Sequence, residues 1–233
     1  MRLGRYLANS GLGTRREVKA LIHQGLVKVD GIIVKTDSIN IDENINKVYV
    51  NDEEVIYRQF YYVLLNKPKG YVSAVEDNVY PPVTDLASEY AFAKLFPVGR
   101  LDVDTTGTLL LTNNGDLCHK LLSPKYHVDK TYLVEVDFDL KDSLISSFEK
   151  GIMLDDELTL PAKLEIIDNR HAYLTIHQGK FHQVKRMFKE FGYTVINLDR
   201  VIFAFLNHND LALGEYRVLK EDEINQLIEL VNK

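Results

Sequence analysis

The sequence predicts an α+β protein, with a small helix–helix–hairpin module followed by a larger domain built on a largely antiparallel mixed sheet. The first 35 residues carry seven Lys or Arg and two acidic side chains, a net charge of +5, whereas the whole chain of 233 residues carries −6 and the remainder therefore −11. Beyond this basic stretch, strand-like runs recur without regular alternation with helices. We expect the basic module and its linker to occupy residues 1–55 and the larger domain to occupy residues 56–233.

The elements of the basic module follow from local signals. Residues 2–9 place their apolar side chains on one face, which predicts a short helix. Thr14 and Glu17 have the spacing of a capping box and predict the start of a second helix, which the glycine at position 25 would end. Asp30-Gly31 lies between two β-prone runs and predicts a hairpin, because its turn needs positive φ angles.

The linker and the larger domain are predicted from periodicity and turn signals. The acidic, poorly periodic residues 50–58 are interpreted as a linker. Strand-like runs lie at 60–66, 71–75, 109–112, 131–136, 163–167, 172–177 and 194–205. Helical patterns lie at 84–90, 142–150, 181–191 and 221–231. A further helix is expected to begin at Asp116, whose side chain would cap it.

A loop bounded by glycines, residues 99–107, contains one Arg, two Asp and two Thr between rigid elements, which is a usual way to build a site. Residue type and spacing leave three interpretations of Asp102 and Asp104 open. One of them could act as nucleophile or base at the anomeric carbon of a sugar. The pair could instead bind a divalent cation. Both could also serve only as partners for hydrogen bonds within the turn.

Composition excludes several classes of protein. The single cysteine, Cys118, excludes an internal disulfide and a multi-cysteine metal site. The N-terminal residues lack an apolar core of signal-peptide length, and no run approaches the length of a membrane span. We therefore expect a cytoplasmic protein that does not bind a membrane. The histidines show no metal-ligand spacing, and we expect no bound metal.

The first part of the chain, residues 1–48, resembles the S4 RNA-binding module. The resemblance rests on the predicted helix pair with Thr14-Arg15-Arg16 and on the run Val27-Lys28-Val29-Asp30-Gly31. Cationic side chains near a helix N-terminus would meet RNA phosphates, and such contacts position a protein while carrying little sequence information. The candidate RNA-binding residues are Arg15, Arg16 and Lys19, with Arg2, Arg5 and Lys28 around them.

Four motifs in the larger domain resemble the pseudouridine synthases of the RsuA group, which modify ribosomal RNA. In chain order they are Asn66-Lys67-Pro68-x-Gly70, Gly99-Arg100-Leu101-Asp102-x-Asp104-Thr105-x-Gly107, Lys130-Thr131-Tyr132 and Gly179-Lys180-Phe181-His182-Gln183-Val184-Lys185-Arg186-Met187-Phe188. Together with the S4-like module, the resemblance spans almost the whole chain. The chain departs from the group after Arg200, where the group commonly has a glycine-containing turn, so the shape of that loop is open.

The resemblance implies an isomerase that converts a uridine in RNA to pseudouridine. The C1′–N1 bond is broken, the base rotates and C1′ is joined to C5, so the reaction needs no cofactor and no metal. Asp102 would be the essential carboxylate, which either attacks C1′ or removes the C2′ proton. Tyr132 matches the active-site tyrosine that packs on the uracil and could remove the C5 proton. A phenol with its ordinary pKa of about 10 is a poor base, and a core aromatic is the alternative interpretation of Tyr132.

The resemblance also implies positioning roles. Lys180 is assigned as the ion-pair partner of Asp102, because a carboxylate in a dry pocket needs such a partner. Arg100 shares a face with Asp102 if the loop is extended, and would contact RNA around a flipped uridine. Asp104 is expected to brace the loop together with the two threonines that follow it. Expected phosphate contacts on the following helix are Lys185, Arg186 and Lys189.

The partner is expected to be ribosomal RNA, and the protein is expected to be a monomer. The Asp-Thr-Thr-Gly, Lys-Thr-Tyr-Leu-Val and Gly-Glu-Tyr-Arg segments resemble the small-subunit members of the group, which favours 16S RNA or a partly assembled small subunit. The same chemistry on a 23S uridine is an alternative. A non-catalytic ribosome-assembly factor is another, disfavoured because Asp102, Tyr132 and Lys180 occur together. A metal-dependent nucleotide enzyme is a third, and it would need a further acidic ligand near Asp102.

Overall fold

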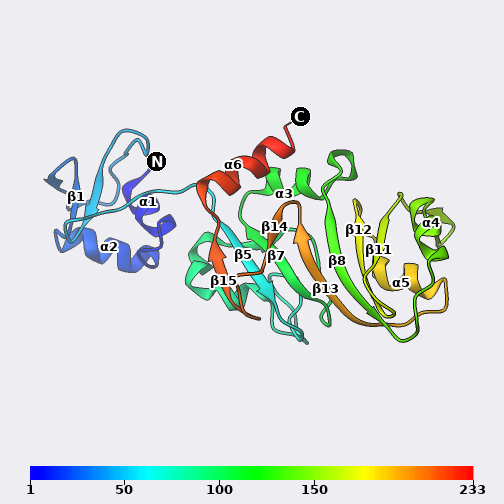
Figure 1. The fold of residues 1–233 in the computed structure, drawn as a ribbon. Helices are drawn as coiled ribbons and strands as arrows, with labels where there is room; N and C mark the ends of the chain where they lie inside the picture. Colours follow the sequence, from blue (N-terminus) through cyan, green and yellow to red (C-terminus); the bar gives the residue numbers. More distant parts are fainter. Residues whose placement is uncertain (233) are drawn as a thin grey trace. The chain divides into compact units, whose positions relative to one another are not determined.

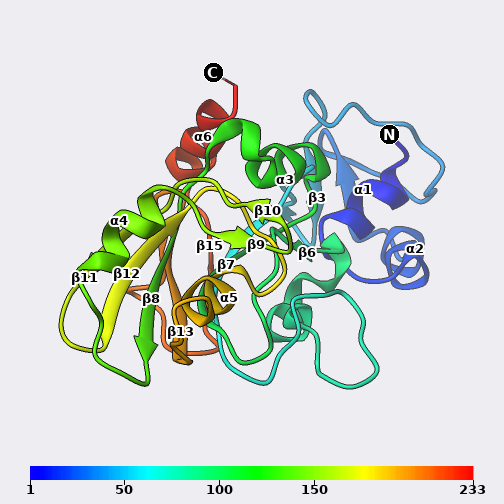
Figure 2. The ribbon, with the colours of Figure 1, turned by 90° about the vertical axis from the view of Figure 1, so that its right-hand side faces the viewer.

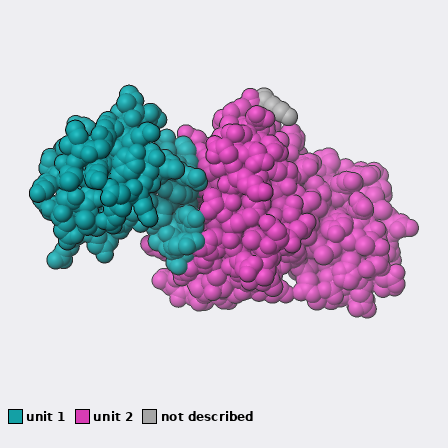
Figure 3. Space-filling model, turned by 60° about the vertical axis from the view of Figure 1, so that its left-hand side comes forward, with its two compact units in different colours: residues 1–61, 88–95 teal, residues 62–87, 96–233 magenta. Residues whose placement is uncertain are grey.

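The structure is a computed structural model and describes residues 1–232, which form two compact units. One contains residues 1–61 and 88–95, and the other contains residues 62–87 and the chain from residue 96 onward (Figure 3). The sequence placed the boundary after residue 55, so the structure adds residues 56–61 and 88–95 to the first unit. The 3-10 helix η1 (Val83–Ala93) is interrupted where the units divide, because Ala87 has the non-helical angles φ −114° and ψ 41°.

The first unit has the predicted helices and hairpin. Its elements are α1 (Leu3–Asn9), α2 (Arg15–His23) and an antiparallel sheet in the order β2 (Ile32–Ile33), β1 (Val27–Val29), β3 (Val48–Val50) and β4 (Glu53–Glu54). The capping box is confirmed: the Glu17 amide donates to Thr14 Oγ1 at 3.3 Å, and the Thr14 amide donates to Glu17 Oε2 at 2.7 Å. The hairpin is confirmed too, with φ of 51° at Asp30 and 82° at Gly31.

The prediction that residues 50–58 form a linker is wrong. Val50 belongs to β3, which pairs with β1, and β4 adds to the other side of β3. The hydroxyl of Tyr6 donates to the Val55 carbonyl at 2.7 Å, and the ring of Tyr57 stacks on that of Tyr6 with centroids 5.2 Å apart. Strands of two and three residues are too short to show an alternating pattern, and the exposed glutamates of β4 gave this stretch its polar composition.

The second unit is built on one sheet, whose order is visible in Figure 1. The strands run β11 (Lys163–Ile166), β12 (His171–Ile176), β8 (Lys130–Val136), β13 (Val195–Phe203), β7 (Thr106–Thr112), β5 (Tyr62–Lys67) and β15 (Tyr216–Val218), with β6 (Phe96–Pro97) on β7 and β14 (Leu206–Asn207) on β13. Every pairing along this sheet is antiparallel except that of β13 with β7, which confirms the predicted mixed sheet. A separate hairpin pairs β9 (Met153–Leu154) with β10 (Glu157–Leu158).

Helices cover this sheet. The leucines of α3 (Gly115–Leu122) and α6 (Glu221–Leu230) join one apolar cluster with β5, β7 and β13. The helices α4 (Ser143–Glu149) and α5 (Gln183–Lys189) pack on each other through Phe148 and Phe188, whose ring centroids are 5.1 Å apart. Figure 2 shows α4 and α5 in front of the strands. A short 3-10 helix, η2 (Pro124–Tyr126), follows α3. Within residues 1–232 no helix combines the length and the apolar character needed to cross a membrane.

Three local predictions are corrected. The cap of α3 is Asn114, whose side chain accepts from the Leu117 amide, and Asp116 lies in the first turn instead. Residues 71–75 form no strand and contribute only a bridge between Val72 and Pro82. The predicted helix at 181–191 begins at Gln183, because His182 has the left-handed angle φ 46°.

The loop left open after Arg200 is a tight turn between β13 and β14. Ala204 takes the left-handed angle φ 58° there, and its amide donates to the Asp129 carbonyl at 2.8 Å. A glycine would adopt this angle without strain, so alanine makes the same turn at a conformational cost.

Candidate active site

The glycine-bounded loop ends where β7 meets β13 in the one parallel pairing of the described sheet. Thr106 lies opposite Asp199, and Gly107 lies opposite Arg200. Gly107 has φ 106°, and a Cβ added to it would lie 2.5 Å from the Arg200 carbonyl oxygen. Only glycine permits this approach, which fixes the end of the loop in the middle of the sheet.

Buried side chains from another part of the chain hold the loop by its backbone. The ammonium of Lys67, at the end of β5, is fully buried and donates to the carbonyls of Asp102 at 2.9 Å and Thr105 at 2.8 Å. The hydroxyl of Ser73 donates to the Leu101 carbonyl at 2.8 Å and accepts from the Leu101 amide at 3.0 Å. These hydrogen bonds fix the backbone from which Asp102 presents its carboxylate.

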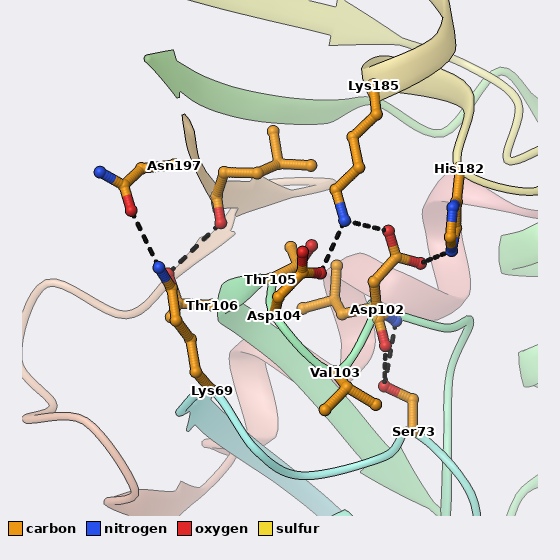
Figure 4. Close-up of polar contacts among 12 residues, drawn as sticks. Lys69, Ser73, Asp102, Val103, Asp104, Thr105, Thr106, His182, Lys185 and Asn197 are labelled. Atoms are coloured by element: carbon orange, nitrogen blue, oxygen red, sulfur yellow. Dashed lines mark hydrogen bonds and ion pairs between the residues drawn. The ribbon is translucent and has the colours of Figure 1, made fainter. Parts of the chain in front are cut away.

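The carboxylate of Asp102 is held between two basic side chains (Figure 4). Lys185 Nζ, on α5, donates to Asp102 Oδ2 at 2.9 Å, and His182 Nε2 lies 3.5 Å from Asp102 Oδ1. Lys185 Nζ also donates to Asp104 Oδ1 at 2.6 Å. The predicted brace is thus corrected: Asp104 shares the ammonium with Asp102, while Lys67 and Ser73 brace the loop.

The prediction that Lys180 is the ion-pair partner of Asp102 is wrong. Lys180 Nζ pairs with Glu157 Oε2, on β10, at 2.5 Å, and Lys185 takes the place beside Asp102. The reason is that α5 begins at Gln183, so Lys180 lies in the turn before the helix and Lys185 lies in its first turn. Both lysines belong to the same motif, and the sequence alone predicts Lys185 only as a phosphate contact.

Charge and burial compete in this ion pair. Burial raises the pKa of Asp104, but the hydrogen bond and the charge of Lys185 outweigh it and leave the pKa lowered. Burial lowers the pKa of Lys185, but the hydrogen bonds to Asp104 and Asp102 outweigh it and leave the pKa raised. Lys185 therefore stays an ammonium and Asp104 a carboxylate at neutral pH.

All charged side chains that are buried within residues 1–232 are cations: Lys67, Lys130 and Arg200. Burial lowers the pKa of Lys67 to about 8, although the charges of Asp102 and Asp104 act in the opposite direction. Burial, together with the charge of Arg200, lowers the pKa of Lys130 to about 8 as well. Their ammonium groups are satisfied by backbone carbonyls, as with Lys130 Nζ and Val128 O at 3.0 Å. Buried cations give this acidic unit a local positive potential.

A second polar network, which sequence reasoning missed, supports the start of β7. Thr106 Oγ1 donates to Asp199 Oδ1 at 2.6 Å, and Asp199 Oδ2 lies 3.4 Å from His208 Nε2. The hydroxyl of Thr108 lies 2.9 Å from His208 Nδ1. These residues come from three separate stretches, so no local spacing in the sequence could have joined them.

Two further predicted site residues of the second unit are Arg100, in the loop, and Tyr132, on β8. Arg100 is exposed, Leu101 is buried and the side chain of Asp102 is 27% exposed, an alternation that puts Arg100 and Asp102 on one side. Tyr132 is buried in the middle of β8, opposite Arg200 on β13.

Arg186 is tied to two neighbouring segments. Its NH2 group pairs with Asp155 at 2.6 Å, and its NH1 group donates to the Phe181 carbonyl at 3.3 Å. A phosphate would have to compete with Asp155 for this guanidinium.

Five of the six cations predicted to bind RNA through the first unit are exposed, and among the described residues they form no ion pair: Arg2, Arg5, Arg15, Arg16 and Lys19. Lys28 differs, since its Nζ pairs with Asp52 Oδ1 at 2.5 Å. A phosphate would compete with Asp52 for Lys28, whereas the other five cations are available.

The arrangement provides a carboxylate with fixed position and a permanent counter-ion. Such a group can act as nucleophile or as base. Lys185, rather than a third carboxylate, lies between Asp102 and Asp104, and an ammonium there would repel a divalent cation. No group of three or more His, Cys, Asp or Glu side chains in residues 1–232 could hold a metal ion.

Comparisons with known proteins agree with this geometry. Residues 61–190 match the family described as RNA pseudouridylate synthase, and residues 1–44 match the S4 domain. The chain is 45% identical to a protein of Bacillus subtilis named "Uncharacterized RNA pseudouridine synthase YtzG", over 98% of this chain and 99% of that protein. It is 40% identical to "Ribosomal small subunit pseudouridine synthase A" of Haemophilus influenzae, over 98% of this chain and 100% of that protein.

A large-subunit relative and a solved structure are also similar. "Ribosomal large subunit pseudouridine synthase B" of Bacillus subtilis is 37% identical, over 97% of this chain and 95% of that protein. A structure titled "Crystal structure of pseudouridylate synthase" superposes with a TM-score of 0.69 at 38% identity, over 97% of this chain and 99% of that one.

Proposed function

Because the chain belongs to the family of RNA pseudouridylate synthases and carries an S4 domain, we propose that it isomerises a uridine of small-subunit (16S) ribosomal RNA with Asp102 as the reacting carboxylate. The coarser activity, conversion of uridine in RNA to pseudouridine, is that of the family. The observation that carries the proposal is the placement of Asp102 between Lys185 and His182, on a loop that Lys67 and Ser73 hold by its backbone.

In the proposed reaction each group has one task. Asp102 either attacks C1′ or removes the C2′ proton, and both routes need a carboxylate oxygen that reaches the ribose. Lys185 holds Oδ2 and leaves Oδ1, on the side of His182, for the substrate. Arg100 lies on the same side of the loop and would occupy the space that the flipped uridine leaves in the RNA. Tyr132 would pack on the uracil.

Small-subunit RNA is proposed because the relative named for the small subunit is 40% identical and the one named for the large subunit is 37% identical, and because the sequence motifs favour the same target. A large-subunit (23S) uridine is the alternative. The protein is proposed to act as a monomer. The proposed compartment is the cytoplasm, where ribosomal RNA is available to a bacterial enzyme.

The test maps pseudouridine in small- and large-subunit RNA transcripts and in assembly intermediates after treatment with the purified protein. We expect modification of the small-subunit RNA by the wild type and none by Asp102→Asn. Asp104→Asn is the matched control from the same loop, and we expect it to keep at least about a tenth of the activity, because Asp104 is mostly exposed. Absence of pseudouridine from both RNAs would contradict the activity. Modification of the large-subunit RNA alone would contradict the target, and an active Asp102→Asn would contradict the role of Asp102.

A further inference from the structure

An exposed aromatic ring lies directly beside the proposed site. Phe181 is 75% exposed, although other phenylalanines of this unit, such as Phe148 and Phe188, are completely buried. Exposure of a phenyl ring forgoes the stabilisation that burial would give. A single exposed apolar side chain is ordinary on a protein surface, and Phe181 is distinguished by the way its ring is held.

Phe181 stacks on the face of His182, the residue whose ring edge lies beside the carboxylate of Asp102. Its ring lies parallel to that of His182, with centroids 3.9 Å apart and an interplanar angle of 15°. His182 in turn places Nε2 3.5 Å from Asp102 Oδ1, and Figure 4 shows its ring edge-on beside Asp102. His182 therefore contacts the carboxylate through its edge and Phe181 through its face, and the outer face of Phe181 remains exposed.

The peptide that carries the ring is fixed on both sides. The Lys180 amide donates to the side chain of Gln183 at 2.9 Å, and Gln183 is buried. The Gln183 amide donates to the Lys180 carbonyl at 3.1 Å, and Arg186 donates to the Phe181 carbonyl at 3.3 Å. A ring on a fixed peptide loses little entropy when another ring packs on it.

Resting on the proposed function, we propose that the free face of Phe181 stacks on the base next to the target uridine. Removing one nucleotide from a stack leaves its neighbour with an uncovered face, and proteins cover such faces with aromatic side chains. Two cations lie near the ring: Lys180 precedes it, and Arg186 bonds its carbonyl. An RNA phosphate would compete for them with Glu157 and Asp155, so the stacking surface itself carries the proposed contact. Because every base has such a face, this contact adds affinity with weak dependence on sequence.

The direct test uses fluorescence, since the chain contains no tryptophan. A Phe181→Trp substitution introduces one fluorophore, in the Asp102→Asn background so that the RNA is not converted. The probe is a short single-stranded RNA with one uridine flanked by adenines. We expect saturable quenching with this RNA, and little quenching when the two adenines are replaced by abasic sites. Phe138→Trp is the matched control, because Phe138 is 64% exposed and lies beyond the end of β8, and its fluorescence should not change. Equal quenching by both RNAs, or none by the first, would overturn the proposal.

Kinetics separate stacking from simple packing on His182. We expect Phe181→Leu to raise KM for small-subunit RNA roughly tenfold with kcat unchanged, and Phe181→Tyr to restore the wild-type KM. A fall in kcat without a change in KM would mean that Phe181 only supports His182, and would overturn the proposal. A wild type that forms no pseudouridine contradicts the proposed function instead, and the fluorescence test, which needs no turnover, then still decides the role of Phe181.

Discussion

Lys185 binds two carboxylates that differ in how much solvent reaches them. The side chain of Asp104 is 69% exposed and that of Asp102 is 27% exposed, while Lys185 lies 2.6 Å from the first and 2.9 Å from the second. Solvent screens the pair with Asp104 more strongly, so the shorter contact is not the stronger constraint. The geometry makes Lys185 the residue that positions Asp102, with Asp104 as a second anchor for the same ammonium.

Substitution of the two lysines of one motif tests this assignment. We expect Lys185→Met to lower kcat by about 100-fold or more, because Asp102 loses its fixed counter-ion, and Lys185→Arg to recover part of the loss. Lys180→Met is the matched control and should change kcat less than about threefold, since Lys180 pairs with the exposed Glu157. Single-turnover rates on small-subunit RNA make the measurement. The reverse order of effects would restore Lys180 as the partner of Asp102.

The buried Lys67 makes both the free energy of unfolding and the activity depend on pH. Its pKa is about 8 in the folded protein and about 10.4 in an unfolded chain. Between these values the unfolded chain binds the proton more readily, so the contribution of Lys67 to the free energy of unfolding rises as the pH increases. Activity should change in the opposite direction, because above pH about 8 the ammonium that holds the loop carbonyls becomes a neutral amine.

Urea unfolding at pH values from about 7 to about 9.5 checks this prediction. We expect the rise in unfolding free energy to shrink by about half in Lys67→Met, since Lys130 has the same pKa and contributes the remainder. We also expect kcat of Lys67→Met to be about 100-fold lower at neutral pH, because the loop loses its brace. An unchanged pH dependence of stability would show that Lys67 does not titrate in this range.

At the scale of elements, the turn between β13 and β14 carries measurable strain. Ala204 has φ 58°, an angle that costs an L-residue on the order of 1 kcal/mol. We expect Ala204→Gly to stabilise the protein by about 0.5 kcal/mol, the relief of strain less the greater freedom of glycine in the unfolded chain. Ala204→Val should destabilise it. Urea midpoints with an unchanged slope provide the measurement, and a destabilising Ala204→Gly would mean that the methyl group contributes more through packing than the angle costs.

The elements that could be predicted from the sequence are those with strong local signals. Residues close together in the sequence determine three of them: the capping box at Thr14, the Asp30-Gly31 turn and the buried run of β7. The short strands β3 and β4 carry no such signal, because their pairing with distant residues creates them. The pairing of β13 with β7 joins residues 93 positions apart and has no local signal either.

In the candidate site, too, some residues can be predicted from local sequence and others depend on tertiary contacts. The loop motif marks Asp102 and Asp104 as candidates, because two glycines enclose charged residues, but only the resemblance to the RsuA group favours Asp102 over Asp104. Local sequence was not sufficient to choose between Lys180 and Lys185, since that choice depends on where α5 begins, and the left-handed His182 sets that point. Lys67 was visible only as part of a motif, because its burial and its bonds to the loop are tertiary properties.

At the scale of the whole molecule, positive charge is concentrated in residues 1–35, which carry +5, while the remainder of the chain carries −11. The exposed cations of α1 and α2 suit RNA phosphates, while in the second unit Lys67 and Lys185 contact the residue Asp102 itself. Such a distribution favours the positioning of RNA by the first unit.

The salt dependence of RNA binding distinguishes cations that contact RNA from exposed cations that do not. We expect Arg15→Ala combined with Arg16→Ala to weaken binding of small-subunit RNA and to reduce the slope of log affinity against log salt by about one for each arginine. Lys141→Ala combined with Lys150→Ala removes the same charge from exposed positions flanking α4 and should leave the slope unchanged. Binding measured over a range of salt concentrations gives the slopes, and equal slopes for the two double variants would remove Arg15 and Arg16 from the RNA interface.

Residues that contact each other in the site are far apart in the sequence, so they leave the ribosome at different times during protein synthesis. Asp102 and Lys185 are 83 positions apart, and Thr106 and Asp199 are 93 apart. The chain leaves the ribosome from its N-terminus, so the first unit can be complete once residue 95 has emerged, while Asp102 must wait for α5 and β13. The first unit can therefore fold well before the contacts of Asp102 and of the start of β7 can form.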